Sequence, residues 1–294
     1  SASLTASGRG MPLKELNRGS GAVGNWLLKV YTADVLEYTF RWGGAQQASQ
    51  KLRVIFMSPD EDVYCLGIMK IKKSDKKELE DAKAQKWKVG NVVRASKVVF
   101  AEDKGQFVNA SFKSVIDLRA TTFDRLLVAP VVMPSKPAPP ALVTDILSIE
   151  GRGSHRFDIT GLCEVSAVRC AQTKQGPRAI CDVMLMHGSQ RLGADKKSII
   201  NFTIFVPCGA ACSMVDLPEQ MRNFKTETDA QKPISFFALN ADRQGQELQV
   251  HTSAEFFWDT ADGARAATLR AAAAELWSLK DNEKERASIP IISR

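Results

Sequence analysis

Two segments of the chain each place one aromatic residue on an otherwise polar strand face. In residues 107–113 and 199–206, apolar residues occupy alternate positions, and the remaining positions include Phe107 and Phe205. The same two polar faces also contain Asn109, Ser111, Lys113, Asn201 and Thr203. Because successive strand residues point to opposite sides of a sheet, we expect both rings to face outward, where each can stack on a nucleobase. The alternative is a ring covered by a loop or a neighbouring domain, since single exposed apolar residues are common.

Basic residues that can bind phosphates lie near these segments. Two of them fall on the outward face of the alternating strand 51–57, and the others border predicted loops over residues 41–50 and around 174–178 or belong to the basic run 70–77. The basic candidates are Arg41, Lys51, Arg53, Lys70, Lys174 and Arg178, and Trp42 beside Arg41 is a candidate for contact with a base. A positive groove beside flat aromatic surfaces is what single-strand binding requires. For the run 70–77, a solvated helix entrance is the alternative.

The net charge of the chain is concentrated in its first half. Residues 1–135 contain 21 Lys and Arg against 14 Asp and Glu, whereas residues 136–294 contain 19 of each. The whole excess of +7 therefore lies in the first half. A localised basic excess is typical of an anionic partner such as nucleic acid.

Motifs for catalysis, cofactors or metals are missing from the sequence. The chain has no phosphate loop and no His-Glu-x-x-His motif, and its three histidines show no metal-ligand spacing. Cys208 and Cys212 could form half of a zinc site, but no second pair follows at a fitting distance. We therefore predict no enzyme activity, cofactor, metal or small-molecule substrate, and six reduced cysteines in a nuclear or cytosolic protein. No apolar run approaches the roughly 20 residues of a membrane span, so we expect no membrane partner.

Five prolines crowd into residues 130–140 and indicate a stiff connector between two domains. The predicted organisation is a flexible tail over residues 1–24, a basic first domain over 25–129, a proline-rich linker over 130–141, a second domain with a C-terminal helix over 142–279, and a charged tail over 280–294. Each domain shows three strand patterns, a helical segment, and two further strand patterns. Asp75 to Glu78 resembles a capping box and predicts a helix of about ten residues. This order predicts a mainly β chain of two tandem OB-folds, five-stranded Greek-key barrels with a helix between strands three and four.

Several short motifs resemble one family. They are residues 26–30 at the first strand, 106–108 near the last strand of the first domain, 143–147 (VTDIL), 157–163 (FDITGLC), 248–253 (LQVHTS) and 266–270 (AATLR). In this order and spacing the chain resembles the tandem DNA-binding domains A and B of the replication protein A large subunit, a eukaryotic single-stranded-DNA binder. The resemblance covers about residues 24–279 and implies a divergent or shortened relative.

The resemblance also implies which residues contact bases. In the family, each domain stacks bases on one aromatic of its third strand and one near the loop between its fourth and fifth strands. Phe205 matches the third-strand aromatic of the second domain, and Phe107 matches the later aromatic of the first. The other two positions depart from the pattern, with Met69 and Arg243. Methionine can make apolar contact with a base, and the planar guanidinium of arginine can stack on one.

The sequence therefore predicts a nuclear protein that binds single-stranded DNA in replication, repair or recombination. A protein-interaction module or scaffold, with a partner bound by the predicted helix over residues 261–279, is the first alternative. A binder of single-stranded RNA or of telomere ends is the second. An organellar or cytoplasmic location is the alternative to the nucleus.

Overall fold

The structure, a computed structural model, describes residues 13, 16, 23–59, 64–71, 76–101, 106–107, 115–129, 132–134, 154–173, 176–186, 199–208, 213, 215–244, 247–261, 267 and 291–292. They belong to two compact units. The first is formed by residues 1–104 and 111–138, and the second by residues 105–110 and 139–294. The proline-rich linker stays a prediction, because most of its residues lie outside the described ones.

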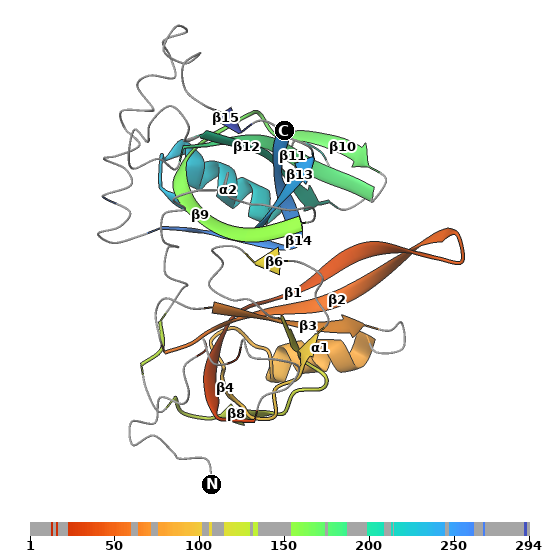
Figure 1. Cartoon of the computed structure of the whole chain (residues 1–294), viewed down its shortest axis with the longest axis vertical. Helices are drawn as coiled ribbons and strands as arrows, with labels where there is room; N and C mark the ends of the chain where they lie inside the picture. Colours follow the sequence, from red (N-terminus) through yellow and green to blue (C-terminus); the bar gives the residue numbers. More distant parts are fainter. Residues whose placement is uncertain are drawn as a thin grey trace, which may run out of the picture. The chain divides into compact units, whose positions relative to one another are not determined.

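The first unit is a strand meander closed by two short strands (Figure 1). Its elements are β1 (Trp26–Trp42), β2 (Ala45–Met57), β3 (Tyr64–Ile71), α1 (Lys76–Gln85), β4 (Val92–Ala95), β5 (Phe100–Ala101), β7 (Val115–Asp117) and β8 (Phe123–Leu126). β1 pairs with β2 and β4, β2 pairs with β3, and β3 runs parallel to β7. β7 pairs with β5, which follows β4 after residues 96–99. The strand order β5-β7-β3-β2-β1-β4-β8 is that of an OB-fold sheet, with α1 between its third and fourth strands as predicted.

The core of the first unit follows from alternation along β2. Leu52, Val54 and Phe56 are fully buried, and they are the positions predicted to face inward. The ring of Trp87 contacts Phe56 and Phe123 edge-on, with centroid distances of 5.6 and 5.0 Å. Edge-to-face contacts at such distances are favourable for aromatic pairs. This cluster holds the sheet from which the outer side chains of β2 and β3 project.

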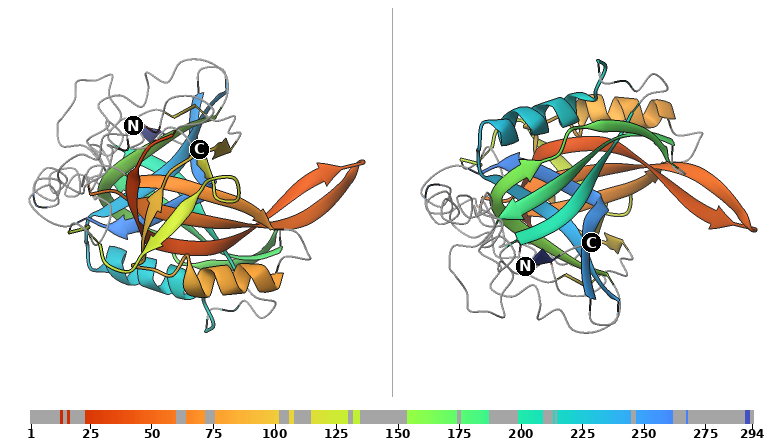
Figure 2. Two further views of the ribbon diagram at one scale, coloured as in Figure 1. Left: turned by 90° about the horizontal axis from the view of Figure 1, so that it is seen from below. Right: turned by 90° about the horizontal axis from the view of Figure 1, so that it is seen from above.

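The predicted loop over residues 41–50 is wrong, because the chain forms a long β-ribbon there. β1 continues to Trp42, which pairs with Ala45 at the start of β2. Gly43 and Gly44 make the turn with φ of +58° and +81°, values that favour glycine and that suit the two-residue turn of a twisted hairpin. Figure 2 shows this ribbon extending well beyond the other strands of its unit.

The second unit repeats the order. Its elements are β6 (Gln106–Phe107), β9 (Ser154–Val165), β10 (Arg169–Thr173), β11 (Gly176–Met186), β12 (Ile199–Pro207), α2 (Glu219–Asp229), β13 (Ile234–Gln244), β14 (Glu247–Thr260) and β15 (Ile291–Ile292). β11 pairs with β9, β10 and β12, while β13 pairs with β9 and β14. β14 also lies beside β12, which brings the two ends of the sheet together. The fold class, two tandem OB-folds in a mainly β chain, is therefore confirmed.

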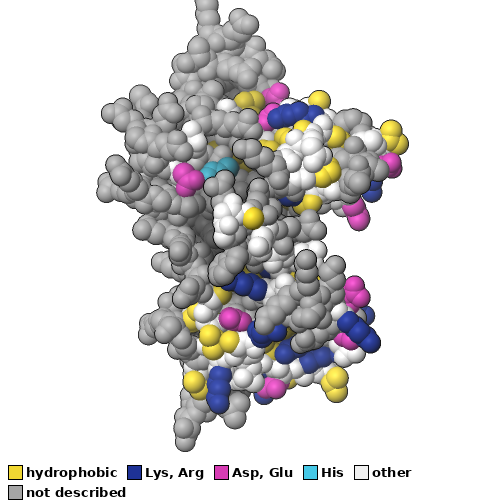
Figure 3. Space-filling model, turned by 90° about the vertical axis from the view of Figure 1, so that its right-hand side faces the viewer, with side chains coloured by type: hydrophobic (Ala, Val, Ile, Leu, Met, Phe, Trp, Pro, Cys, Tyr) yellow, Lys and Arg dark blue, Asp and Glu magenta, His cyan; other side chains and the backbone are white. Residues whose placement is uncertain are grey.

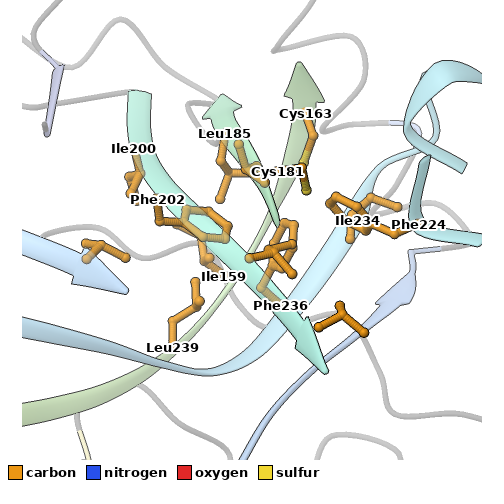
Figure 4. Close-up of a cluster of buried hydrophobic side chains, with 14 of the residues drawn as sticks. Ile159, Cys163, Cys181, Leu185, Ile200, Phe202, Phe224, Ile234, Phe236 and Leu239 are labelled. Carbon is orange, nitrogen blue, oxygen red and sulfur yellow. The ribbon is translucent and has the colours of Figure 1, made fainter. Parts of the chain in front are cut away.

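The core of the second unit is built by the apolar face predicted for residues 199–206 (Figure 4). Phe202 packs edge-on against Phe236, with ring centroids 5.1 Å apart. Phe224 of α2 reaches the same cluster, at 6.0 Å from Phe236. Burying these positions turns the intervening residues of β12 outward. The predicted C-terminal helix lies outside the described residues, except for Ala267, which is helical.

The segment around Phe107 differs from its prediction. Gln106 and Phe107 form β6, which runs parallel to β9 of the second unit, beside His155 and Arg156. The sequence pattern over residues 107–118 predicts a single strand of the first barrel, and this prediction is wrong for Phe107, which pairs with a strand of the second unit. Within the described part of this segment, β7 is the strand that pairs with the first unit.

The cysteines differ in state. Cys208 is disulfide-bonded, so the prediction of six reduced thiols is wrong. Cys65, Cys163, Cys170 and Cys181 are free. Within the described part of the chain, no helix is both long enough and apolar enough to span a membrane.

Candidate nucleic-acid interface

The outward sides of β10, β11 and β12 form one surface, here called the second outer face. Phe205 of β12 pairs with Ile180 of β11, which in turn pairs with Arg169 of β10. Phe205 is 45% exposed, whereas Ile180 beside it is buried. Among the side chains that the structure describes, Phe205 is the one exposed aromatic ring. The predicted outward orientation of Phe205 is thus what the structure has.

Asp182 organises the polar part of the second outer face. Its carboxylate accepts a hydrogen bond from Nη1 of Arg169 at 2.7 Å and another from the hydroxyl of Thr203 at 2.6 Å. This hydrogen bond with Asp182 raises the pKa of Arg169. About half of the Arg169 side chain is exposed, so its guanidinium offers a flat cationic surface two strands away from the Phe205 ring. At an ordinary strand spacing of about 4.8 Å, two strands separate such groups by about 10 Å.

Two candidate residues of the second unit, Thr203 and Arg178, are buried within the sheet and are not exposed to a ligand. Thr203 is only 3% exposed, and its hydroxyl is engaged by Asp182, so the prediction that it contacts bases is corrected. Arg178 stands opposite Pro207 in the β11–β12 register, and its side chain is buried at 8% exposure. A buried guanidinium is not accessible to phosphate, so that prediction is corrected as well. Asn201, opposite Met184, is half-buried and remains on the second outer face.

In the first unit, β2 and β3 bring two lysines together. Lys51 and Lys70 are directly opposite each other in the antiparallel register. Lys51 is half-buried and Lys70 is exposed. Arg119, which follows β7, donates from Nη2 to the backbone carbonyl of Lys70 at 3.4 Å, so a third cation lies nearby. We call Lys51, Lys70 and Arg119 the basic cluster. Figure 3 shows Lys and Arg side chains at the surface of the first unit, in the lower part of the view.

The neighbouring row of the same sheet is neutralised. Arg53 forms an ion pair with Asp34 of β1, with 2.9 Å between Nη2 and Oδ2, and its side chain is only 6% exposed. Asp34 also accepts a hydrogen bond from the hydroxyl of Thr32. The prediction of Arg53 as an exposed phosphate contact is therefore corrected, because a buried arginine needs its carboxylate partner.

Met69 is corrected too. Its side chain packs against the hydrophobic core of the first unit. Alternation along β3 explains this orientation, since Cys65 and Ile71 are buried in the same core at even spacing from it. The position that the resemblance compared with a base-stacking ring thus faces the barrel interior, and Lys70 is the neighbour that faces outward.

For four of the remaining candidates the structure describes the backbone but not the side chain. Arg41 and Trp42 lie at the end of the β1–β2 ribbon, where Arg41 pairs with Gln46. Phe107 lies in β6. Arg243 lies in β13, opposite Leu248. Asn109, Lys113 and Lys174 are outside the described residues.

Sequence reasoning missed two residues that this arrangement singles out, Arg169 and Asp182. The pattern of residues 156–171 predicts one long strand, whereas Ser166–Val168 separate β9 from β10. The pairing of β10 with β11 that brings Arg169 to Asp182 is therefore visible only in the structure.

No protein-family model and no curated protein matches the sequence. Among solved structures, the chain is similar to a replication protein A heterotrimer bound to ssDNA, with 12% identity and a TM-score of 0.46, over 96% of this chain and 57% of that chain. It is also similar to the Ifi202 HINa domain in complex with 20bp dsDNA, with 9% identity and a TM-score of 0.39, over 83% of this chain and 100% of that one. A third similar structure is p202 HIN1 in complex with 12-mer dsDNA, with 10% identity and a TM-score of 0.39, over 85% of this chain and 99% of that one. The fold assignment rests on the strand order of this chain itself.

Proposed function

We propose that the chain binds single-stranded nucleic acid, and single-stranded DNA by preference, without catalysing a reaction. The observation that supports this most directly is Phe205, a ring that is 45% exposed on the same face of the sheet as Arg169, two strands away. An exposed aromatic ring offers a base a flat stacking partner.

The basic cluster supplies the second requirement of the proposal. Lys51 and Lys70 place two positive charges directly opposite each other on the sheet. Two cations at that spacing can contact one phosphate group or two neighbouring ones. In each unit the relevant side chains come from the second and third strands of the barrel, the β2–β3 pair in one and the β11–β12 pair in the other. We propose that each barrel uses this strand pair, in a nuclear protein that resembles replication protein A.

Fluorescence anisotropy tests the proposal. Labelled single-stranded DNA and RNA of about 30 nucleotides, near the upper site size of two OB-folds, are titrated beside duplex DNA at low and high salt. We expect binding to single-stranded DNA to be tightest and to weaken with salt. Tighter binding to RNA would mean that the natural ligand is single-stranded RNA, bound by the same base stacking and phosphate contacts. Equal binding to duplex, or no binding to any of the three, would contradict the proposal.

A second candidate, a protein-interaction module, is favoured by one observation. Leu127 and Val132, after the last described strand of the first unit, are 93% and 96% exposed. Exposed apolar residues this close together in the chain are suited to a protein partner. This candidate predicts a stable protein complex and no salt-dependent binding of nucleic acid in the same titration.

A further inference from the structure

A short strand remote in the sequence occupies the edge of β12. Ile291 and Ile292 form β15, which runs parallel to β12 beside Ile199 and Ile200 (Figure 1). β15 also lies beside β14. It is therefore seated where the third and fifth strands of the second barrel approach each other, and it supplies backbone partners to an edge that would otherwise present unpaired groups.

The register of this pairing gives positions 291 and 292 different partners on β12. Ile292 stands next to Ile200, whose side chain is 0% exposed and belongs to the second core. Ile291 stands next to Ile199, at the positions that alternate with the core and continue into Asn201. Neighbouring positions of a sheet share its face, so position 292 is on the core side and position 291 on the opposite side.

β15 is distant from β14 in the sequence, because residues 261–290 lie between the two strands. Since both strands belong to one chain, β15 is present at the edge of β12 at a high local concentration. Pro290, immediately before Ile291, has no N–H to donate, which suits a segment that pairs along one side only.

We propose that the edge of β12 at Ile199 and Ile200 is an acceptor site for an extended aliphatic peptide, and that β15 is its resident ligand. Recognition is by strand addition, in which backbone hydrogen bonds provide affinity and alternate side chains provide specificity. The specificity position is the one occupied by Ile292, and it requires an apolar side chain because it adjoins the buried Ile200. This site is independent of the proposed nucleic-acid binding.

The test uses the whole chain and a labelled peptide of residues 286–294. The Ile292→Lys chain has an emptied site, because a charged side chain beside the core is costly. The Ile291→Lys chain is the matched control. We expect the peptide to bind the Ile292→Lys chain at least about tenfold more tightly than the natural chain, in which the resident strand competes. The Ile291→Lys chain should bind the peptide no better than the natural chain. A peptide that itself carries Ile292→Lys should not bind.

Three results would overturn the proposal. One is equal peptide binding by the natural and the Ile292→Lys chains. Another is the same gain for both lysine variants, which would contradict the register. The third is loss of the folded circular dichroism in the Ile292→Lys chain and in the milder Ile292→Ala chain, since an exchangeable ligand must leave a folded barrel behind.

Discussion

Lys51 of β2 and Lys70 of β3 lie directly opposite each other in the antiparallel register of the first barrel. In the next row of the sheet, Arg53 is paired with Asp34 on β1. Two positive charges therefore lie side by side in one row of this sheet, and the arginine of the next row is paired with a carboxylate. Adjacent positive charges at a surface are suited to an anionic partner.

Replacing both lysines by glutamine should weaken the binding of single-stranded DNA, because two positive charges that can contact phosphate are lost. The slope of log K against log salt should become shallower by about 0.7 for each lost phosphate contact. Salt titrations of both chains measure the change. The Lys88→Gln, Lys97→Gln chain makes the same charge change at two exposed lysines outside the cluster, and an equal loss of affinity there would reject the site.

Phe205→Ala should weaken single-stranded DNA binding by about 1–3 kcal/mol, which is roughly 5- to 150-fold, because a base would lose its stacking partner. The folded state should change little, since the ring is half exposed and outside the core. Anisotropy titrations of the two chains give the ratio. Val215→Ala, at an 87% exposed apolar residue away from the second outer face, is the control. Equal affinities of the natural and Phe205→Ala chains would count against stacking here.

Asp182→Asn should strengthen binding at low salt. Arg169 is now neutralised by the Asp182 carboxylate, and the amide of asparagine can still accept the Thr203 hydroxyl. With one more net positive charge on the second outer face, we expect the salt slope to steepen by about 0.7. Asp229→Asn removes a carboxylate paired with Lys225 on α2 and is the matched control. A comparable gain in that control would mean that only the total charge matters.

Gly67→Val should destabilise the first barrel. A Cβ atom at this position of β3 would lie 2.4 Å from Cδ2 of Leu118 and 2.9 Å from Cε2 of Phe56, so both side chains would have to move. Forcing extra volume into a packed core typically costs about 1–3 kcal/mol. Chemical denaturation measures the loss. Ile68→Val, at the outward-facing neighbour on the same strand, should lower the free energy of unfolding by less. A larger loss in Ile68→Val than in Gly67→Val would show that close packing at Gly67 does not determine the stability of the barrel.

The buried thiols should be unreactive in the native state. Burial raises the pKa of Cys181 from its usual 9.0 to about 12, and burial also raises the pKa of Cys163. The thiolate is the reactive form, so at pH 8 a thiol reagent should modify both residues only after unfolding. Because the unfolded thiols ionise first, their contribution to stability is complete below pH 9 and is lost as the pH rises toward 12. Mass spectrometry of labelled peptides checks the first point, and melting temperatures above pH 9 check the second.

The sequence predicted those features that depend on local periodicity. The alternation of Leu52, Val54 and Phe56 predicts a strand and the sequence around Asp75 predicts a helix, and the structure has β2 and α1 at these places. The same reasoning predicted the orientation of Phe205 correctly. Its neighbours Ile204 and Val206 are buried in the core, and successive strand residues point to opposite sides, so Phe205 faces outward.

Local patterns could not indicate which strands become neighbours. Arg53 and Arg178 read as surface cations, yet the first is buried with its partner Asp34 19 positions earlier, and the second is buried opposite Pro207. Met69 was predicted to contact a base, but its position in the register of β3 makes its side chain pack against the core. The ribbon of residues 26–57 reads as two strands and a loop, because a Gly-Gly turn looks the same in either setting.

What the sequence determined by itself was therefore the type and order of the elements and which side of each strand is apolar. These follow from a period of two or of 3.6 residues and need no distant partner. The tertiary structure decided that Lys51 lies opposite Lys70 and that Asp182 accepts hydrogen bonds from Arg169 and Thr203. It also decided that residues 106–107 pair with β9 and that β15 pairs with β12. Each of these depends on pairing between residues far apart in the chain. Such pairing is selected by the burial of the whole core rather than by any local preference of the residues involved.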